Sequence, residues 1–229
     1  KDEAMLLIDT SGMALHKRGY RPHAGAAPLR ETLAAAIALT ARPRPDVLFW
    51  DPFCGSGTIA IETAMILQNR APGLNRTFAG EQFDRLPAPL WEHAREAARA
   101  AIKTDSGCEV WASDIDEDMT DMTYDCAARA GVEDVMNIFA ADARTIEKPD
   151  RRGTILCNPP YGERLMTEAE AADLYRAMGR RFATFEPWQI YVLTSCESFE
   201  RLYGRRADKT RKLYNGMLKC DLFIYDNKK

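Results

Sequence analysis

The feature that most constrains the fold is a strand signal, a glycine turn and a helix signal that follow one another without a gap. Residues 47–51 are an apolar run closed by Asp51, which predicts a buried parallel strand. Residues 59–67 are mainly apolar and predict a helix. Gly55 and Gly57 lie between them, where they let backbone approach a ligand, and the N-terminus of the helix attracts a carboxylate or a phosphate. This order opens a nucleotide-type βα unit and predicts an α/β fold.

Further strands and helices alternate downstream. Apolar runs predict strands at residues 109–114, 135–142, 154–157 and 189–193. Helical spacing of apolar residues predicts helices at residues 27–37, 90–102, 119–130 and 169–182. Residues 212–224 predict a hairpin, because Asn215-Gly216 is a preferred two-residue turn. A weaker alternation predicts a small hairpin at residues 5–15. The chain should therefore form a mostly parallel sheet that ends in an antiparallel hairpin.

A second constraint is Asn158-Pro159-Pro160-Tyr161, which follows the apolar run at residues 154–157. Neither proline can donate to a sheet ladder, so Asn158 and Tyr161 lie on a stiff turn at the carboxyl end of a strand. Open α/β sheets bind their ligands at that edge. The Asn158 side-chain oxygen and the Pro159 carbonyl can both accept hydrogen bonds from one planar amino group, and Tyr161 offers a ring face for a flat base or amide. A plain proline-rich turn with a core tyrosine is the alternative interpretation.

Two more acids close strands at the same edge. Asp114 ends its strand where a carboxylate can accept both hydroxyls of a ribose. Asp116 is the rival for that role, although it is also well placed to cap the next helix. Asp142 ends the following strand, where an adenine amino group would lie, and a helix cap or loop acid is the alternative.

Two basic stretches are candidates for contact with nucleic acid. Residues 16–23 hold Lys17, Arg18, Tyr20 and Arg21, which could bind phosphate and stack on a base. A solvated loop is the alternative there. The second stretch consists of Arg205, Arg206, Lys209, Arg211 and Lys212.

The composition limits the class of protein. The chain has 229 residues, enough for one large domain or one domain with an extension. A net charge of -3 argues against a protein that grips nucleic acid with its whole surface, but not against a local basic patch. Six cysteines without close pairing indicate neither a zinc site nor a disulfide framework, so a cytoplasmic location is expected. No apolar run is long enough to span a bilayer.

Several motifs together resemble one enzyme family. The string from Asp51 to Thr58 resembles motif I of amino-methyltransferases that use S-adenosylmethionine, and Asn-Pro-Pro-Tyr resembles their motif IV. The third glycine of the dinucleotide fingerprint is missing, so a dehydrogenase is a poor interpretation. With residues 15–21 and 27–31, residues 71–76, residues 158–165 and residues 211–216, the chain resembles the methyltransferase domain of the THUMP-containing RNA guanine-N2 methyltransferases, near the bacterial 23S rRNA enzymes. Gly80 and Phe83 depart from the family pattern around Glu81, which leaves no role assigned to that acid.

This resemblance implies a Rossmann-like class I methyltransferase fold with a seven-stranded sheet and helices on both faces. The catalytic domain would span residues 46–229, after an extension of a hairpin and a helix at residues 1–45. An RNA-binding THUMP domain precedes this region in the family and is expected to be absent from this chain. No metal and no membrane association are expected.

The resemblance also implies roles for particular residues. S-adenosylmethionine would be the cofactor, with its methionine end held by the backbone amides around residues 54–58. The residues expected to bind the cofactor are Asp51, Pro52, Phe53, Cys54, Gly55, Ser56, Gly57, Thr58, Asp114, Ile115, Asp142, Ala143 and Asn158. The residues expected to act on the target base are Asn158, Pro159, Pro160 and Tyr161. The residues expected to contact RNA are Lys17, Arg18, Tyr20, Arg21, Arg164, Arg211 and Lys212.

The expected reaction is methylation of guanine N2 in 23S rRNA, on a base that has left its stack. Three alternatives stay open from the sequence. The same tetrapeptide fits a DNA adenine-N6 methyltransferase or a glutamine-directed protein methyltransferase. A cofactor-binding RNA module without catalysis, acting in ribosome assembly, is the alternative from a different class.

Overall fold

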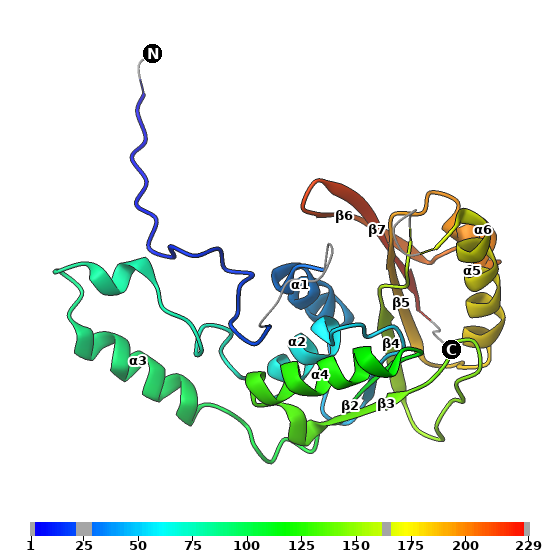
Figure 1. The fold of residues 1–229 in the computed structure, drawn as a ribbon, viewed down its shortest axis with the longest axis horizontal. Helices are drawn as coiled ribbons and strands as arrows, with labels where there is room; N and C mark the ends of the chain where they lie inside the picture. Colours follow the sequence, from blue (N-terminus) through cyan, green and yellow to red (C-terminus); the bar gives the residue numbers. More distant parts are fainter. Residues whose placement is uncertain (1–2, 22–28, 162–165, 227–229) are drawn as a thin grey trace.

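The computed structural model describes residues 3–21, 29–161 and 166–226, and it forms an α/β domain (Figure 1). The strands are β1 (Leu48–Asp51), β2 (Val110–Asp114), β3 (Met136–Ala140), β4 (Gly153–Cys157), β5 (Gln189–Thr194), β6 (Lys209–Asn215) and β7 (Leu218–Tyr225). The helices are α1 (Glu31–Ala41), α2 (Thr58–Leu67), α3 (Ala88–Ala100), α4 (Glu117–Ala130), α5 (Glu168–Ala183) and α6 (Phe199–Tyr203), with short 3-10 helices η1 (Ala79–Gln82) and η2 (Glu133–Val135). No helix in these ranges is long and apolar enough to cross a membrane.

Within the described ranges the strands form one seven-stranded sheet in the order β3-β2-β1-β4-β5-β7-β6. The pairs from β3 to β5 are parallel, whereas β7 runs antiparallel to β5 and β6 antiparallel to β7. The expected Rossmann-like fold, with its mostly parallel sheet and terminal hairpin, is therefore confirmed. The strand order reverses between β1 and β4, and ligands bind outside the carboxyl ends of the strands at such a point.

Helices cover both faces of the sheet (Figure 1). On β1, Phe49 packs into the cluster shared with α1, α2 and α4, while Leu48 and Trp50 pack into the cluster shared with α5 and α6. All four residues of β1 are buried. A strand covered on both faces is apolar at every position instead of alternating, which is why the run at residues 47–51 signalled a central parallel strand.

The C-terminal hairpin forms, but its turn lies one residue later than expected. Asn215 pairs with Leu218, so the two loop residues are Gly216 and Met217. Gly216 has a φ of 66°, which suits glycine at the first position of a type II′ turn. Asn215 instead ends β6, and its Oδ1 accepts a hydrogen bond from the Arg30 backbone amide at 3.3 Å.

The hairpin expected at residues 5–15 is wrong, because residues 3–21 contain no strand. The side chains of Met5 to Ile8 are between 79% and 95% exposed, so nothing in the described chain packs on them. Arg76 takes the place of a partner strand, because its guanidinium donates to the backbone carbonyls of Ser11, Met13 and Ala14. An isolated two-stranded hairpin is marginal in water, so a weak alternation alone does not form one.

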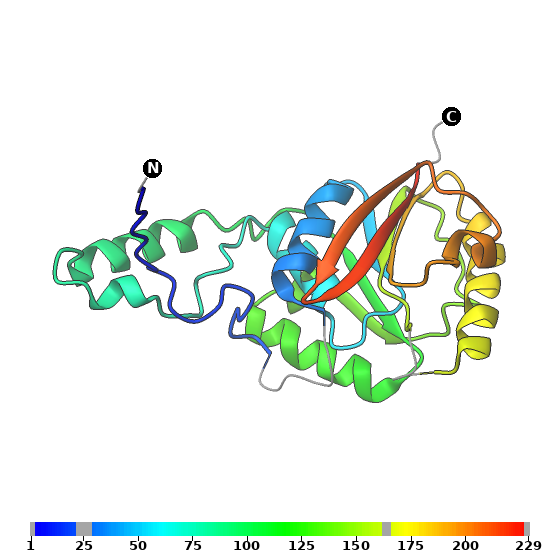
Figure 2. The same cartoon turned by 90° about the horizontal axis from the view of Figure 1, so that it is seen from above.

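The long connection between α2 and β2 forms an arm that stands away from the sheet (Figures 1 and 2). Its helix α3 spans Ala88–Ala100, two residues earlier than expected, and has no buried residue. Phe78 stacks on Trp91 with ring centroids 5.7 Å apart, and the Gly80 amide donates to the Thr10 carbonyl at 2.9 Å. Trp91 of α3 therefore packs on its own loop, which in turn bonds to the N-terminal segment, and no residue of α3 belongs to the described core.

Candidate active site and cofactor-binding residues

The glycine turn between β1 and α2 is tied to the neighbouring strand and helix. The Gly55 amide donates to Asp114 Oδ2 at 2.9 Å, and the Cys54 amide donates to the Ser113 carbonyl at 3.0 Å. Gly57 is the N-cap of α2, with a φ of 79°. A Cβ atom there would lie 2.7 Å from Cγ2 of Thr123 in α4, so glycine is needed both for its conformation and for the close packing.

Asp51 closes β1 beneath this turn and is almost fully buried, with 1% of its surface exposed. Its Oδ1 accepts the Phe53 amide at 3.1 Å. Burial raises the pKa of Asp51 to about 8, with a smaller contribution from the charge of Asp114, while the hydrogen bond from the Phe53 amide acts in the opposite direction. Pro52 is buried beside it, while Phe53, Gly55 and Ser56 remain partly open to solvent. The expected cofactor residues from Asp51 to Thr58 thus form one continuous turn.

The two acids proposed for the ribose have different surroundings. Asp114 ends β2 next to the glycine turn, and its Oδ1 accepts the Asp116 amide at 3.2 Å. Asp116 is the N-cap of α4, where its side chain accepts the Asp118 amide at 3.0 Å. The side chain of Ile115 is 65% exposed between them. Both acids therefore have structural tasks, because Asp116 caps α4 and Asp114 accepts the amides of Gly55 and Asp116, but only Asp114 contacts the glycine turn.

Asp142 lies two residues beyond the end of β3, so this strand is shorter than expected. Arg144 forms a bidentate contact with it, from Nε to Oδ1 at 2.9 Å and from Nη2 to Oδ2 at 2.6 Å. These hydrogen bonds lower the pKa of Asp142 below its usual value. Ala143 is buried, and the Ala141 amide donates to the Asp114 carbonyl at 2.8 Å, which joins the ends of β3 and β2.

Asn158 follows β4, the strand next to β1, so it lies at the edge where the glycine turn is found. Its Oδ1 is buried and has no hydrogen-bond partner among the described residues. A buried acceptor without a donor is unfavourable by about 1–3 kcal/mol, so this atom is suited to a donor from a ligand. The turn is fixed from behind, because the Tyr175 hydroxyl donates to the Pro160 carbonyl at 3.0 Å. Tyr161 is half-buried, and its hydroxyl lies 3.8 Å from Cys220 Sγ in β7.

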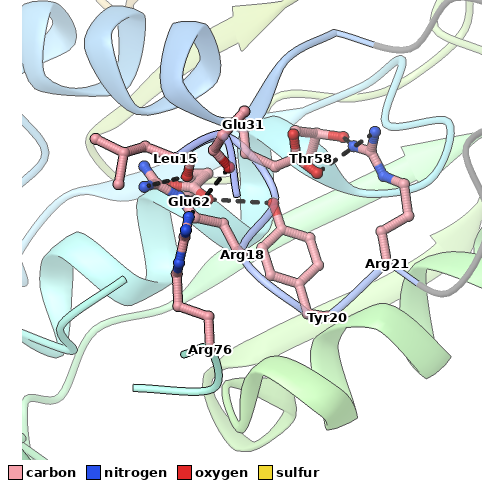
Figure 3. Close-up of polar contacts among 9 residues, drawn as sticks. Leu15, Arg18, Tyr20, Arg21, Glu31, Thr58, Glu62 and Arg76 are labelled. Carbon is pink, nitrogen blue, oxygen red and sulfur yellow. Dashed lines mark hydrogen bonds and ion pairs between the residues drawn. The ribbon is translucent and has the colours of Figure 1, made fainter. Parts of the chain in front are cut away.

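The first basic stretch does not present the RNA-contacting surface that the sequence suggested (Figure 3). The stacking role expected for Tyr20 is wrong: the residue is 2% exposed, and its hydroxyl donates to Glu62 Oε1 at 3.2 Å. Arg18 pairs with the same carboxylate at 3.3 Å, with its side chain 11% exposed. The side chain of Arg21 is 7% exposed and contacts Thr58 and Glu31. Arg18 therefore faces the buried acid Glu62 of α2, and Arg21 faces Glu31 of α1.

The remaining RNA candidates are on the surface or outside the described residues. Lys17, Arg211 and Lys212 are exposed, and Arg164 lies outside the described ranges. A groove of about 1150 Å³ runs between the basic stretch, the N-terminus of α1, the arm and the tip of the hairpin. Lys17, Arg21 and Arg30 are among the residues that line it. No group of three or more His, Cys, Asp or Glu residues that could hold a metal ion is found in the described ranges.

Glu62 and Glu31 are functional neighbours that the sequence reasoning missed. Glu62 is the one acid within the apolar run at residues 59–67, and it is 2% exposed. Burial raises its pKa, while the Arg18 guanidinium acts in the opposite direction. A lone acid inside an apolar helix signals a buried charge that must find a cation, so this position could have predicted the pairing with the basic stretch.

A family comparison decides the class of protein. The profile of the family described as "RMKL-like, methyltransferase domain" matches residues 18–224. The chain belongs to this family.

Relatives of this methyltransferase domain are longer than the chain. The chain is 43% identical to YpsC of Bacillus subtilis (strain 168), which is by its name a candidate RNA methyltransferase. The match covers all of this chain and 59% of YpsC. The chain is 40% identical to the ribosomal RNA large subunit methyltransferase K/L of Vibrio campbellii (strain ATCC BAA-1116), over 96% of this chain and 32% of that protein. The chain therefore spans a third to three fifths of the length of these relatives.

A solved structure connects the methyltransferase fold to its cofactor. The crystal structure of SMU.472, a candidate methyltransferase complexed with S-adenosylhomocysteine, matches with a TM-score of 0.90 and 40% identity. The match covers 96% of this chain and 58% of that one. S-adenosylmethionine is the cofactor of this methyltransferase. The residues present fit it, because the glycine turn offers backbone amides at a helix N-terminus and Asn158 offers an unpaired acceptor beside that turn.

Proposed function

We propose that this chain transfers a methyl group from S-adenosylmethionine to N2 of a guanine in ribosomal RNA. The observation that carries the proposal is the buried Oδ1 of Asn158, which has no hydrogen-bond partner among the described residues and lies at the strand end beside the glycine turn. An exocyclic amino group brings two N–H donors, and this oxygen can accept one of them. A relative named as a ribosomal RNA large subunit methyltransferase supports RNA as the substrate.

The side chains of the chain itself would bind and align the two reactants. S-adenosylmethionine supplies a methyl group on a positively charged sulfonium. Asn158 and the Pro159 carbonyl would accept hydrogen bonds from the amino group, which directs its lone pair at the methyl carbon. Tyr161 would stack on the flipped base, and Pro160 would keep the turn rigid through its bond with Tyr175. Alignment of this kind supplies most of the rate in tethered reactions.

The cofactor would lie across the carboxyl ends of β2, β1 and β4. The turn from Asp51 to Thr58 would hold the methionine end, and Asp114 would accept the ribose hydroxyls beside Ile115. Asp142, with Ala143, would lie near the adenine. When the bond from nitrogen to the methyl carbon forms, the bond from that carbon to sulfur breaks, and the nitrogen then releases a proton.

RNA would be held by the exposed cations Lys17, Arg211 and Lys212 around the groove, together with Arg164. A THUMP domain in the longer protein would share this task, in line with the net charge of -3. We also propose a catalytic domain at residues 46–229 and an extension at residues 1–45, which packs on it through α1. An rRNA substrate and buried, unpaired cysteines both fit a cytoplasmic enzyme.

The test is methyl transfer from labelled S-adenosylmethionine to unmodified 23S rRNA, tRNA, duplex DNA and a mixture of ribosomal proteins, with analysis of the methylated nucleosides and amino acids. The proposal expects N2-methylguanosine in rRNA. Asn158→Ala should lower turnover by about 10²- to 10³-fold while cofactor affinity stays within about threefold. Tyr161→Phe keeps the ring and should retain most activity, whereas Tyr161→Ala should lose it.

Three outcomes would replace the proposal. N6-methyladenine in DNA would retain the amino-group chemistry but change the substrate. Transfer to a protein glutamine would do the same. No transfer to any substrate, despite binding of S-adenosylhomocysteine, would favour a non-catalytic module in ribosome assembly.

A further inference from the structure

Arg21 is a buried cation with few partners among the residues that the structure describes. Its side chain is 7% exposed, and Nη2 donates to Oγ1 of Thr58 (Figure 3). Nη1 lies 3.7 Å from Oε1 of Glu31, beyond the usual length of a charge-assisted hydrogen bond. Nε is buried and has no hydrogen-bond partner among the described residues. A guanidinium has five N–H donors, so this one retains unused donors where water has little access.

The position of Arg21 makes the missing partner an anion. Thr58 is the first residue of α2, a helix of ten residues, and the N-terminus of a helix carries a partial positive charge. A cation next to that charge is repelled unless a negative group lies between them. Glu31 offsets part of the charge from the side of α1, but no described acid contacts the guanidinium at hydrogen-bond distance.

An anion can reach this position, because Arg21 and Glu31 both line the groove of about 1150 Å³. The bond from Arg21 to Thr58 puts the guanidinium beside the last residue of the glycine turn. In the cofactor orientation proposed above, on which this inference rests, the carboxylate at the methionine end of S-adenosylmethionine lies at that turn. A planar carboxylate also matches the planar fork of a guanidinium.

We propose that Arg21 binds the carboxylate of the methionine half of S-adenosylmethionine, together with the amides at the start of α2. This assigns Arg21 to the cofactor and not to an RNA phosphate. The small exposed fraction of the side chain favours a ligand that enters the domain over a phosphate backbone that crosses its surface.

The experiment compares two ligands by isothermal titration calorimetry with no RNA present. S-adenosylhomocysteine carries the carboxylate, and its decarboxylated analogue lacks only that group. Arg21→Met should lower the affinity for S-adenosylhomocysteine by about 10- to 100-fold, which is the range expected for the loss of a hydrogen bond to a charged group. Binding of the decarboxylated analogue should change by less than about threefold, so the preference for the carboxylated ligand collapses.

Arg30→Met is the matched control, because it removes an exposed cation that lines the same groove. In this variant, the ratio of the affinity for S-adenosylhomocysteine to the affinity for the decarboxylated analogue should equal that of the original protein. An unchanged preference in Arg21→Met would overturn the proposal, and a loss of affinity for a single-stranded RNA oligomer in that case would assign Arg21 to phosphate. If Arg21→Met does not fold, a crystal structure of the original chain with S-adenosylhomocysteine decides: a carboxylate out of contact with Arg21 also overturns it.

Discussion

Replacement of Glu62 tests whether the basic segment is held to the domain by a buried charge. Glu62 Oε1 accepts hydrogen bonds from Arg18 Nε at 3.3 Å and from the Tyr20 hydroxyl at 3.2 Å (Figure 3). Alanine would remove the acceptor for both donors. Since the Arg18 side chain is 11% exposed and Tyr20 is 2% exposed, neither donor can recover its hydrogen bond from water without local unfolding.

The expected magnitude follows from the burial of the stranded cation. Removing one partner of a buried ion pair destabilises a protein by about 3–5 kcal/mol. Glu62→Gln keeps one acceptor and loses the charge, so it should destabilise by about 1–2 kcal/mol. For a domain of this size, the alanine variant should lower the melting temperature by about 6–20 °C.

The assay is urea unfolding followed by far-ultraviolet circular dichroism, with limited proteolysis of residues 3–21 as a local readout. Cleavage of that segment should become faster in Glu62→Ala, because its attachment to α2 depends on Arg18 and Tyr20. The double variant Arg18→Met with Glu62→Leu removes both charges. This double variant should recover most of the stability, since apolar residues can replace a buried ion pair with little net change in the free energy of unfolding.

Two results would refute this reasoning. One is a loss of less than about 1 kcal/mol in Glu62→Ala, which would mean that the pair is not buried in solution. The other is a double variant whose loss of stability equals the sum of the losses in Arg18→Met alone and Glu62→Leu alone, since coupled charges in contact should deviate from additivity by at least about 1 kcal/mol. In either case Arg18 and Tyr20 would return as candidates for contact with RNA.

Three further predictions concern the site and its support. Burial raises the pKa of Asp51 to about 8, so the folded state holds this proton more tightly than the unfolded chain. The free energy of unfolding without cofactor should therefore fall as pH rises from about 4 to about 8, and Asp51→Asn should make that fall smaller in urea titrations. Asp114→Ala should lower the affinity for S-adenosylhomocysteine by about tenfold or more in calorimetry. Unchanged affinity in the folded variant would assign ribose binding to Asp116 instead. Gly179→Ala would put a Cβ atom 1.8 Å from the Tyr203 carbonyl oxygen. It should therefore destabilise by about 2 kcal/mol or more, despite the gain of about 1 kcal/mol in helix propensity; a more stable variant would contradict this packing.

Local signals predicted the elements around the site well. The acid that closes β1, the glycines after it and the prolines after β4 each restrict the backbone within a few residues. The predictions that were wrong, the position of the hairpin turn and the hairpin at residues 5–15, depend on contacts with distant segments. Neighbouring residues do not set the turn of the β6–β7 hairpin, since Asn215 ends β6 and its side chain contacts Arg30 on a distant segment. The alternation at residues 5–15 had no partner strand to pair with.

The sequence alone determined the fold class, the glycine turn after β1 and the strand-end position of Asn158, because these depend on hydrophobic runs and on the conformations open to glycine and proline. Only the tertiary structure decided which cations are free. Arg18, Tyr20 and Arg21 lie within four residues of exposed Lys17, yet they face Glu62, Thr58 and Glu31. These pairs form between segments that are far apart in the chain, and the sequence pattern does not show which of those segments lie close together in space.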